Sequence, residues 1–312
     1  MPVEESKMKK IIITGATGFI GKNTLYKILD MEDFSVSVLV RQPSHNKIPK
    51  DNRINIYIGD ILNKESLIKA FNNKDILIHC AGYIGRDKGR LFRVNAQGVE
   101  NVLSAARQAK IKKTIYLSSV SVISANKGVI RDSMPYKASN IYGESKIAGE
   151  KIAWEYINKG LGIVILRPAM VYGPGEPHLT PKLCWLLKKR LFPLIGEADN
   201  KWHLCAVENL LRAIQLSLLN ENMLNRAFIV ADEEILTVKD VIGLLAKSIG
   251  AKRPFIISKG LAHILCKMPL PVARKFITFF SKNREYDISN LKNTGWRQVV
   301  SPWVAIGRAK CI

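Results

Sequence analysis

A tyrosine and a lysine stand four residues apart in the segment Tyr142-Gly143-Glu144-Ser145-Lys146, which opens a predicted helix. This spacing puts a phenol and an ammonium on one helical face. A free phenol has a pKa of about 10, which is too high for a base at neutral pH. A nearby lysine favours the phenolate and lowers that pKa, so the tyrosine can exchange a proton with a hydroxyl or carbonyl. A serine at an adjoining strand end, Ser119 after Ser118, can hydrogen-bond the same substrate oxygen.

A second group of residues predicts a phosphate-binding turn. In Ile11-Ile12-Ile13-Thr14-Gly15-Ala16-Thr17-Gly18-Phe19-Ile20-Gly21, an apolar strand runs into glycines spaced G-x-x-G-x-x-G, and residues 22–29 are predicted to form a helix. Glycines let the backbone approach a pyrophosphate, and a helix N-terminus offers free N–H groups and a positive dipole end. The spacing alone also fits a structural turn, but the flanking strand and helix favour a dinucleotide site.

The elements that must position these residues alternate along the chain. Further strands are expected at residues 36–41, 54–58, 75–80, 114–119 and 161–166, with helices at 67–71 and 95–110 between them. This order indicates an α/β fold with a doubly wound parallel sheet, whose ligands lie beyond the carboxyl ends of the strands. His79 and Cys80 fall within a buried strand, so they are interpreted as core residues, and no metal site is predicted.

The residue just past the second strand distinguishes NAD from NADP. An acidic residue there accepts from the ribose 2′-hydroxyl of NAD, whereas an arginine can pair with the 2′-phosphate of NADP. This chain has Arg41, with no acidic neighbour and with Lys47 and Lys50 nearby. NADP(H) is therefore preferred over NAD(H). The alternative is that Arg41 stacks on adenine or faces solvent.

Composition limits the class of protein. The 312 residues, 47% of them hydrophobic, suffice for a large α/β core with a smaller appendage. The net charge is +22, and residues 239–312 hold 14 Lys and Arg against 3 Asp and Glu. This excess fits an anionic cofactor and substrate, an anionic membrane surface, or simply a lysine-rich solvated surface. Nucleic acid is the least supported partner, because no binding motif accompanies the charge.

The N-terminal region and the cysteines predict a cytoplasmic protein. Residues 1–10 are polar and lack the apolar core of a signal peptide, and no apolar run reaches the ~18 residues that a membrane span needs. The five cysteines show no paired spacing, which predicts reduced thiols with neither a disulfide framework nor a zinc site. They are Cys80, Cys184, Cys205, Cys266 and Cys311.

Together these motifs resemble the extended short-chain dehydrogenase/reductase family, also called the NAD-dependent epimerase/dehydratase family, over about residues 9–303. The glycine turn is similar to the nucleotide-binding turn of that family, Asp60-Ile61 to its adenine contact, and Asn95 to its structural asparagine. The segment from Arg167-Pro168 to Gly175 is similar to the one that lines the nicotinamide and substrate. The resemblance implies a Rossmann fold with a smaller, mostly C-terminal substrate-binding subdomain.

The resemblance also implies roles for individual residues. Tyr142 would be the acid/base, Lys146 would tune it and hold the nicotinamide ribose, and Ser119 would orient the substrate oxygen, with Ser118 and Ser121 as competing serines. Tyr83, Ser119 and His178 are substrate-contact candidates, although a histidine in such a loop is more often just a loop residue. The expected cofactor contacts are Gly15, Thr17, Gly18, Phe19, Ile20, Gly21, Arg41, Asp60, Ile61, Ala81, Gly82, Tyr142, Lys146, Pro168 and Val171. The expected units are a tail (1–9), the dinucleotide-binding domain (10–175) and a mainly substrate-binding subdomain (176–312), with elements around 203–232 returning to the first core.

Departures from the family pattern narrow the reaction. Val120-Ser121 replaces the Asp-Glu pair of sugar-nucleotide 4,6-dehydratases, and Val122-Ile123-Ser124 replaces the Val-Tyr-Gly of many members, weakening the match to 4-epimerases. No cysteine adjoins Ser119, which disfavours epimerase–reductases.

The first hypothesis is an NAD(P)-linked epimerase or reductase of a nucleotide-sugar. The second is an NADPH-dependent reductase or dehydrogenase of a hydrophobic ketone or alcohol, similar to dihydroflavonol reductases or 3β-hydroxysteroid dehydrogenases. A non-catalytic dinucleotide sensor is a third, disfavoured by an intact Ser119, Tyr142 and Lys146.

The rear of the chain carries a basic, apolar segment. Residues 258–282 hold five basic and no acidic residues, and Pro269 and Pro271 split them into two predicted short helices. This segment is expected to be a helical lid over the substrate, or, alternatively, an element that touches an anionic membrane. Family members often dimerise through two helices, and those at Asn95 and Tyr142 are the candidates for a homodimer here.

Overall fold

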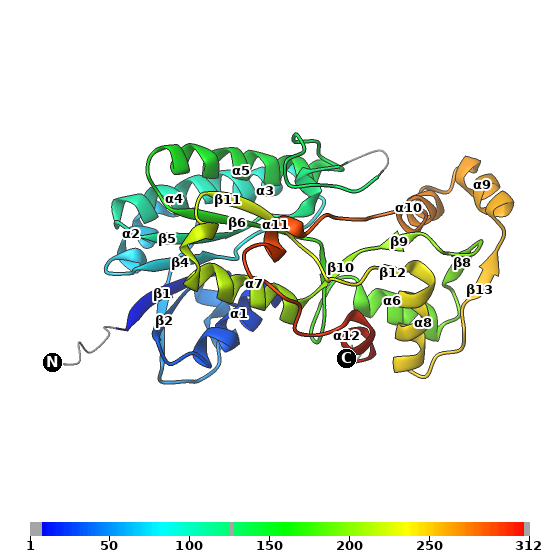
Figure 1. The fold of residues 1–312 in the computed structure, drawn as a ribbon, viewed down its shortest axis with the longest axis horizontal. Coiled ribbons are helices and arrows are strands. Elements are labelled where there is room, and N and C mark those ends of the chain that lie inside the picture. The colour runs from blue at the N-terminus through cyan, green and yellow to red at the C-terminus, as the bar shows by residue number, and fades with distance from the viewer. Residues whose placement is uncertain (1–7, 125–127, 309–312) are drawn as a thin grey trace.

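The central feature is a seven-stranded, entirely parallel sheet with the order β11-β6-β5-β4-β1-β2-β3 (Figure 1). The computed structural model describes residues 8–124 and 128–308. The strands are β1 (Lys9–Thr14), β2 (Phe34–Val40), β3 (Ile54–Ile58), β4 (Ile76–His79), β5 (Lys113–Leu117), β6 (Ile163–Pro168) and β11 (Arg226–Val230). The predicted doubly wound α/β fold is confirmed. The strand order reverses between β1 and β4, and this switch point is where such sheets bind ligands.

Helices cover both faces of the sheet. Figure 1 shows one layer above it and one below it. The upper layer holds α2 (Lys64–Phe71), α3 (Lys88–Phe92), α4 (Gly98–Gln108) and α5 (Ile141–Asn158), and the lower layer holds α1 (Phe19–Leu29) and α7 (Val207–Leu219). Ile11 and Ile13 pack with the core below, whereas Ile12 packs with the core above. Burial on both faces explains why these strands are continuous apolar runs rather than alternating ones.

Several element boundaries differ from the sequence-based expectation. Strand β5 ends at Leu117 rather than at residue 119, so both of the following serines lie in the loop. The helix expected at 95–110 is preceded by α3 and by a π-helical turn, η2 (Arg93–Gln97), before α4 begins. Because a π-turn inserts an extra residue into the helical ladder, it re-aims the side chains around it. Periodicity in the sequence does not reveal such a turn.

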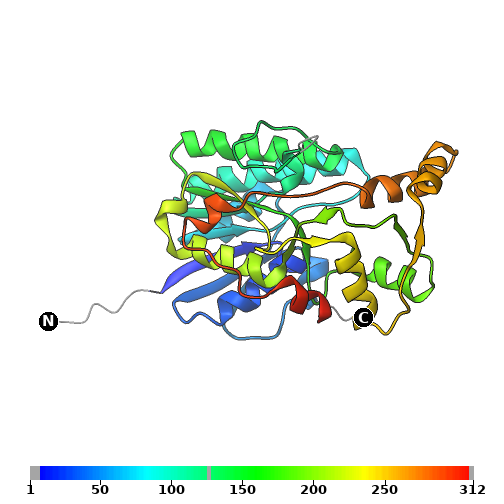
Figure 2. The same ribbon diagram turned by 45° about the vertical axis from the view of Figure 1, so that its right-hand side comes forward.

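A second, smaller core lies beyond the carboxyl ends of the strands (Figures 1 and 2). Three short strand pairs contribute to this part: β7 (Met170–Tyr172) with β10 (Leu204–Ala206), β8 (Pro193–Ile195) with β13 (Phe255–Ile257), and β9 (Lys201–Trp202) with β12 (Leu236–Thr237). Its helices are α6 (Thr180–Lys188), α8 (Val238–Ser248), α9 (Lys259–Lys267), α10 (Pro271–Phe280) and α12 (Pro302–Gly307). The chain returns to the large sheet through α7 and β11. The domain division at residue 175 stays a prediction.

Short elements complete the chain. They are the 3₁₀ turns η1 (Gln42–Lys47), η3 (Val120–Val122) and η4 (Glu221–Met223), and helix α11 (Ser289–Lys292). Within residues 8–124 and 128–308, no helix is long and apolar enough to cross a bilayer, and no cluster of three or more His, Cys, Asp or Glu side chains could hold a metal ion.

The cysteines depart from the expectation at one position. Cys80, Cys205 and Cys266 are free, but Cys184 is disulfide-bonded. Cys311 lies outside the described residues. The expectation of a chain without disulfides is therefore wrong at Cys184, because spacing along the sequence cannot reveal a pair that only the fold brings together.

Candidate active site

The turns after β1 and β4 touch at the switch point of the sheet. A Cβ atom on Gly15 would lie 2.5 Å from the Ala81 nitrogen, and Gly15 has a φ of +76° that only glycine adopts readily. No other residue fits between these two backbones. Gly15 and Ala81, both predicted cofactor contacts, are therefore neighbours in space although 66 positions separate them.

The glycine turn leaves the start of α1 open to a ligand. The Gly18 N–H donates to the Gly15 carbonyl at 3.0 Å, and the Lys22 N–H donates to the Gly18 carbonyl at 2.8 Å. Gly18 is the N-cap, and no side chain caps the helix. Backbone N–H groups of an uncapped first turn bind anions, aided by the helix dipole. The turn therefore fits a dinucleotide diphosphate.

Asn95 joins the loop after β4 to the helix that carries Tyr142. Its Oδ1 accepts from the Tyr83 N–H at 2.8 Å, and its Nδ2 donates to the Tyr83 carbonyl at 2.9 Å and to the Ser145 Oγ at 3.0 Å. Ser145 in turn donates to the Tyr142 carbonyl at 2.7 Å. Asn95 is 1% exposed, so these bonds are shielded from water. It fixes the position of α5 relative to the loop that begins with Ala81 and Gly82.

Ser119, Tyr142 and Lys146 meet at the end of β5. The Tyr142 phenol lies next to Ser119, whose side chain opposes the rise of its pKa, and Ser119 Oγ lies 2.9 Å from Ser121 Oγ. Lys146 is buried one turn further along α5, where its Nζ donates to the Leu117 carbonyl at 2.7 Å. Of the competing serines, Ser118 is buried with no partner for its Oγ in the described part of the chain. The geometry thus favours Ser119 as the serine beside the phenol.

Local contacts place Tyr142 within reach of that serine. The Asn140 side chain caps α5 by accepting from the Gly143 N–H at 2.9 Å. A Cβ atom on Gly143 would collide with the Ser121 carbonyl, so the first turn of α5 lies directly against the loop after β5. Sequence reasoning missed Gly143. The sequence shows that Gly143 adjoins Tyr142. It does not show that Gly143 packs against the backbone of Ser121, about 20 residues earlier in the chain.

The protonation states differ from the expected ones. Burial raises the pKa of Tyr142 to about 12, although the hydrogen bond from Ser119 opposes the rise. Burial also lowers the pKa of Lys146 to about 8, against the attraction of Glu150. The expected lowering of the phenol pKa by Lys146 is not found in this arrangement of the site, because burial raises that pKa and the Lys146 Nζ donates to the Leu117 carbonyl instead. Tyr142 is a protonated phenol at neutral pH.

Arg167 is not a substrate-lining residue. Its guanidinium is 4% exposed and binds the fully buried Glu150, with Nη2 and Oε2 2.6 Å apart. Its Nη1 also donates to the Asp132 carbonyl at 3.0 Å, and Tyr136 donates to Glu150 at 2.9 Å. Although it opens the segment expected to line the nicotinamide and substrate, the Arg167 guanidinium is therefore occupied by Glu150 in the interior. It couples β6 to α5 on the same helical face as Tyr142 and Lys146.

The remaining cofactor candidates surround the switch point. Arg41 is exposed directly after β2. The Asp60 carboxylate accepts from the Leu62 N–H at 2.9 Å and thus shapes its own loop, and Ile61 packs against Gly98. Pro168 ends β6, and Val171 lies in β7.

The two weaker substrate candidates differ in their surroundings. The Tyr83 ring lies under Arg90, with the guanidinium carbon 4.4 Å from the ring centroid. His178 is exposed in the loop after β7 and does not line the apolar cavity beside it. Its contact with substrate stays a prediction.

That cavity lies between β7 and the smaller core. Its walls are mostly apolar, and they include Met170, Tyr172, Leu183, Trp202, Leu204 and Val241. Glu176 also lines it, but its carboxylate accepts from the backbone N–H groups of His178, Leu179 and Thr180 and so caps the start of α6. Among the described residues that line the cavity, none is a lysine or arginine.

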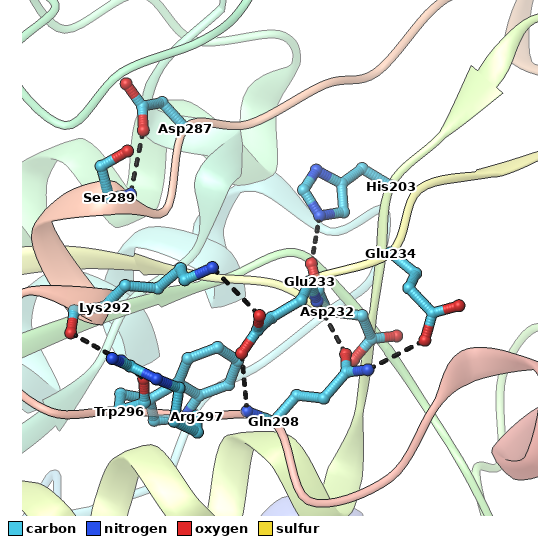
Figure 3. Close-up of polar contacts among 10 residues, drawn as sticks. All are labelled: His203, Asp232, Glu233, Glu234, Asp287, Ser289, Lys292, Trp296, Arg297 and Gln298. Carbon is cyan, nitrogen blue, oxygen red and sulfur yellow. Dashed lines mark hydrogen bonds and ion pairs between the residues drawn. The ribbon is translucent and has the colours of Figure 1, made fainter.

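A buried polar network that the sequence did not reveal holds the C-terminal segment in place, and Figure 3 shows its contact between His203 and Asp232. Asp232 is fully buried and accepts from the Tyr172 hydroxyl at 2.9 Å and from Asn209 Nδ2 at 2.7 Å. His203 Nδ1 accepts from the Tyr286 N–H at 3.1 Å, so its Nε2 carries the proton and donates to the Asp232 carbonyl at 2.6 Å.

Comparison with known proteins places this geometry among related enzymes. A family model, described as "NAD dependent epimerase/dehydratase family", matches residues 11–231. The chain is 26% identical over 262 residues to a 2-alkyl-3-oxoalkanoate reductase from Shewanella oneidensis, a match that covers 77% of this chain and 66% of the reductase. It is 27% identical over 316 residues to a UDP-glucose 4-epimerase from Vibrio cholerae, with 93% and 90% covered.

A solved structure shows the same fold. The UDP-glucuronic acid 4-epimerase from Bacillus cereus, in complex with NAD, superimposes with a TM-score of 0.77 at 20% sequence identity. The match covers 96% of this chain and 97% of that one. At this identity the likeness supports the fold alone.

Proposed function

Because the chain belongs to the NAD dependent epimerase/dehydratase family, we propose that it moves a hydride between a nicotinamide cofactor and a carbinol or carbonyl carbon of a nucleotide-sugar, as an epimerase or a reductase. The observation that carries the proposal is that the Tyr142 phenol lies next to Ser119 after β5, with Lys146 one turn away on the same helix. The similar UDP-glucose 4-epimerase, matched over nearly its whole length, supports the sugar-nucleotide class.

The raised phenol pKa suggests how these side chains act. At neutral pH, Tyr142 is protonated, so in carbonyl reduction it donates its proton to the substrate oxygen as hydride reaches the carbon. Ser119 holds the same oxygen beside the phenol. Proton donation leaves a phenolate, and Lys146, still largely charged at neutral pH, is proposed to hold the nicotinamide ribose beside it. In the opposite direction that phenolate takes the proton back from the substrate hydroxyl.

The cofactor is proposed to be NADP(H), with NAD(H) as the alternative. When bound, it supplies or accepts the hydride. The open first turn of α1 would hold its diphosphate, and the small residues Ala81 and Gly82 leave room for it beside β4. Arg41 is exposed after β2 and forms no ion pair with any described residue, so its charge is free for a 2′-phosphate. The other predicted contacts, from Thr17 to Val171, are part of the same proposal.

A second function is favoured by one comparison. The similarity to a 2-alkyl-3-oxoalkanoate reductase, an enzyme named for a hydrophobic oxo acid, supports reduction or oxidation of a hydrophobic ketone or alcohol. The apolar cavity beside β7 has a volume of only about 30 Å³, which is too small for such a substrate, so it does not carry this function. A cytoplasmic location and a homodimer through α4 and α5 complete the proposal, and light scattering of the purified protein tests the dimer.

Two measurements on the purified protein test these functions. Native mass spectrometry identifies the dinucleotide that it retains, and tight retention would favour an epimerase over a reductase. Turnover is then followed as C4 epimerisation of UDP-sugars by NMR and as NADPH oxidation with 2-alkyl-3-oxo acids. Turnover of the oxo acids alone would replace the first function by the second. A protein that binds neither dinucleotide would refute both.

A further inference from the structure

Helix α9 turns its apolar side toward solvent. Leu261, Ile264, Leu265 and Met268 follow the spacing of one helical face. Leu261, Ile264 and Met268 are 45%, 58% and 47% exposed. A helix that only covers its own core turns such a stripe inward. The single residue of α9 that is buried is Ala262.

The exposed face stands on a well-packed base. Helix α9 packs on α10, whose Phe276 and Phe280 rings lie 5.1 and 5.0 Å from the Phe192 ring. Phe280 also lies 5.4 Å from Trp202, in the smaller core. Helix α10 therefore buries its aromatic side chains in the smaller core. Helix α9 leaves its apolar side chains exposed.

Neighbouring segments extend this surface. Strand β13 leads directly into α9, and Phe255 and Ile256 on it are 49% and 68% exposed. Leu270, between α9 and α10, is 42% exposed. Figures 1 and 2 both show β13, α9 and α10 at the end of the molecule opposite the N-terminal strand β1. Residues 252–275 are called the projection below.

The charge around these apolar side chains has one sign. Between Asp240 and Glu285 the chain has nine lysines and arginines and no acidic residue. Six of the basic residues lie in the projection, are exposed, and form no ion pair with any residue of the described chain: Lys252, Arg253, Lys259, Lys267, Arg274 and Lys275. Exposed apolar and basic side chains thus share one end of the molecule.

We propose that the projection docks on the surface of an anionic lipid bilayer, with the apolar face of α9 at the boundary between headgroups and acyl chains and the basic side chains at the phosphates. A nucleic-acid backbone would pair with the charges but leave the apolar face in water. A second copy would bring two clusters of like charge together. A bilayer with anionic lipids satisfies both features, and the inference does not depend on the proposed reaction.

Vesicle binding of the full-length protein tests this docking. The protein is sedimented with phosphatidylcholine vesicles that contain or lack phosphatidylglycerol, at low and at high salt. We expect binding to the anionic vesicles that weakens as salt screens the charges. Absence of binding to anionic vesicles at low salt would overturn the proposal. No substrate or cofactor is needed, so failure here is independent of failure of the proposed function.

Matched variants separate the projection from the overall positive charge. Arg274→Glu/Lys275→Glu should weaken the partition coefficient at least roughly 25-fold, since each basic residue near an anionic surface contributes about fivefold. Lys64→Glu/Lys69→Glu makes the same charge change on α2, where both side chains are exposed, and should have a far smaller effect. Equal losses for the two pairs would show unspecific attraction and refute docking through the projection.

A second pair tests the apolar face. Ile264→Gln/Met268→Gln should weaken binding, whereas Ile56→Gln/Ile58→Gln, on strand β3 at the sheet edge with side chains 45% and 48% exposed, should not. Unchanged thermal midpoints would show that the variants remain folded. Light scattering gives the mass of each protein. A dimer that only Ile264→Gln/Met268→Gln disrupts would mean that a second copy covers this face, and the bilayer proposal would be wrong.

Discussion

Replacing Tyr142 by phenylalanine removes a single oxygen atom from the candidate active site. The ring remains to fill its place at the start of α5. Ser119 loses its neighbouring phenol oxygen, but it keeps Ser121 Oγ at 2.9 Å and still accepts from the Ser121 N–H at 3.1 Å. No buried polar atom is left without a partner by this change.

The expected effect on catalysis is therefore much larger than the effect on stability. Loss of one hydrogen bond whose partner stays satisfied costs about 1 kcal/mol or less in the free energy of unfolding. Loss of the group that exchanges the substrate proton lowers kcat by about 10²–10⁴-fold, which corresponds to roughly 3–5 kcal/mol in the activation barrier. Dinucleotide affinity should change little, because the glycine turn lies on β1 and α1.

The assay compares kcat, dinucleotide affinity and the urea midpoint of Tyr142→Phe with those of Tyr136→Phe. The Tyr136 hydroxyl donates to Glu150 at 2.9 Å and accepts from Trp154 at 2.9 Å, on the buried side of α5. Removing it should lower stability and leave kcat nearly unchanged. The reasoning would be refuted if Tyr142→Phe kept more than about a tenth of the wild-type kcat, or if the two variants lost activity in parallel.

Three further changes test other parts of the structure. Arg41→Asp should shift preference from NADP(H) toward NAD(H) in titrations of both, and equal affinities before and after would contradict the cofactor assignment. Glu150→Ala leaves the 4%-exposed Arg167 without its carboxylate, so the free energy of unfolding should fall by about 3–5 kcal/mol. The control Glu285→Ala breaks an ion pair nearer the surface, with Lys201, and should cost less than about 1 kcal/mol. Similar losses for both variants in urea melts would argue against a buried pair. Burial raises the pKa of Asp232 to about 6 from its usual 3.8, so the folded state binds a proton more tightly than the unfolded chain. Wild-type protein should thus gain stability relative to Asp232→Asn as pH falls from 7 through 6 toward 4. Thermal melts of both proteins across this pH range test this, and a difference between their midpoints that does not change with pH would disprove it.

Much of the fold could be predicted because its signals are local. The β-branched run before Gly15 and the glycine spacing after it specify a strand, a turn and a helix start within a dozen residues. The prolines at 269 and 271 predicted the break between α9 and α10, and the structure confirms it. Tyr142 and Lys146 could be paired from the sequence because i, i+4 spacing is a property of any helix.

What the sequence by itself determined was thus the order of strands and helices, the glycine turn, and which polar residues follow the strand ends. Only the tertiary structure decided that Arg167 binds Glu150, that the phenol of Tyr142 stays protonated, and that Asn95 joins the loop after β4 to α5. The apolar face of α9 likewise became visible as an outward surface only once its packing on α10 was known. The physical reason is that burial, desolvation and close backbone approach depend on residues distant in the chain, whereas backbone conformation and periodicity depend on neighbours.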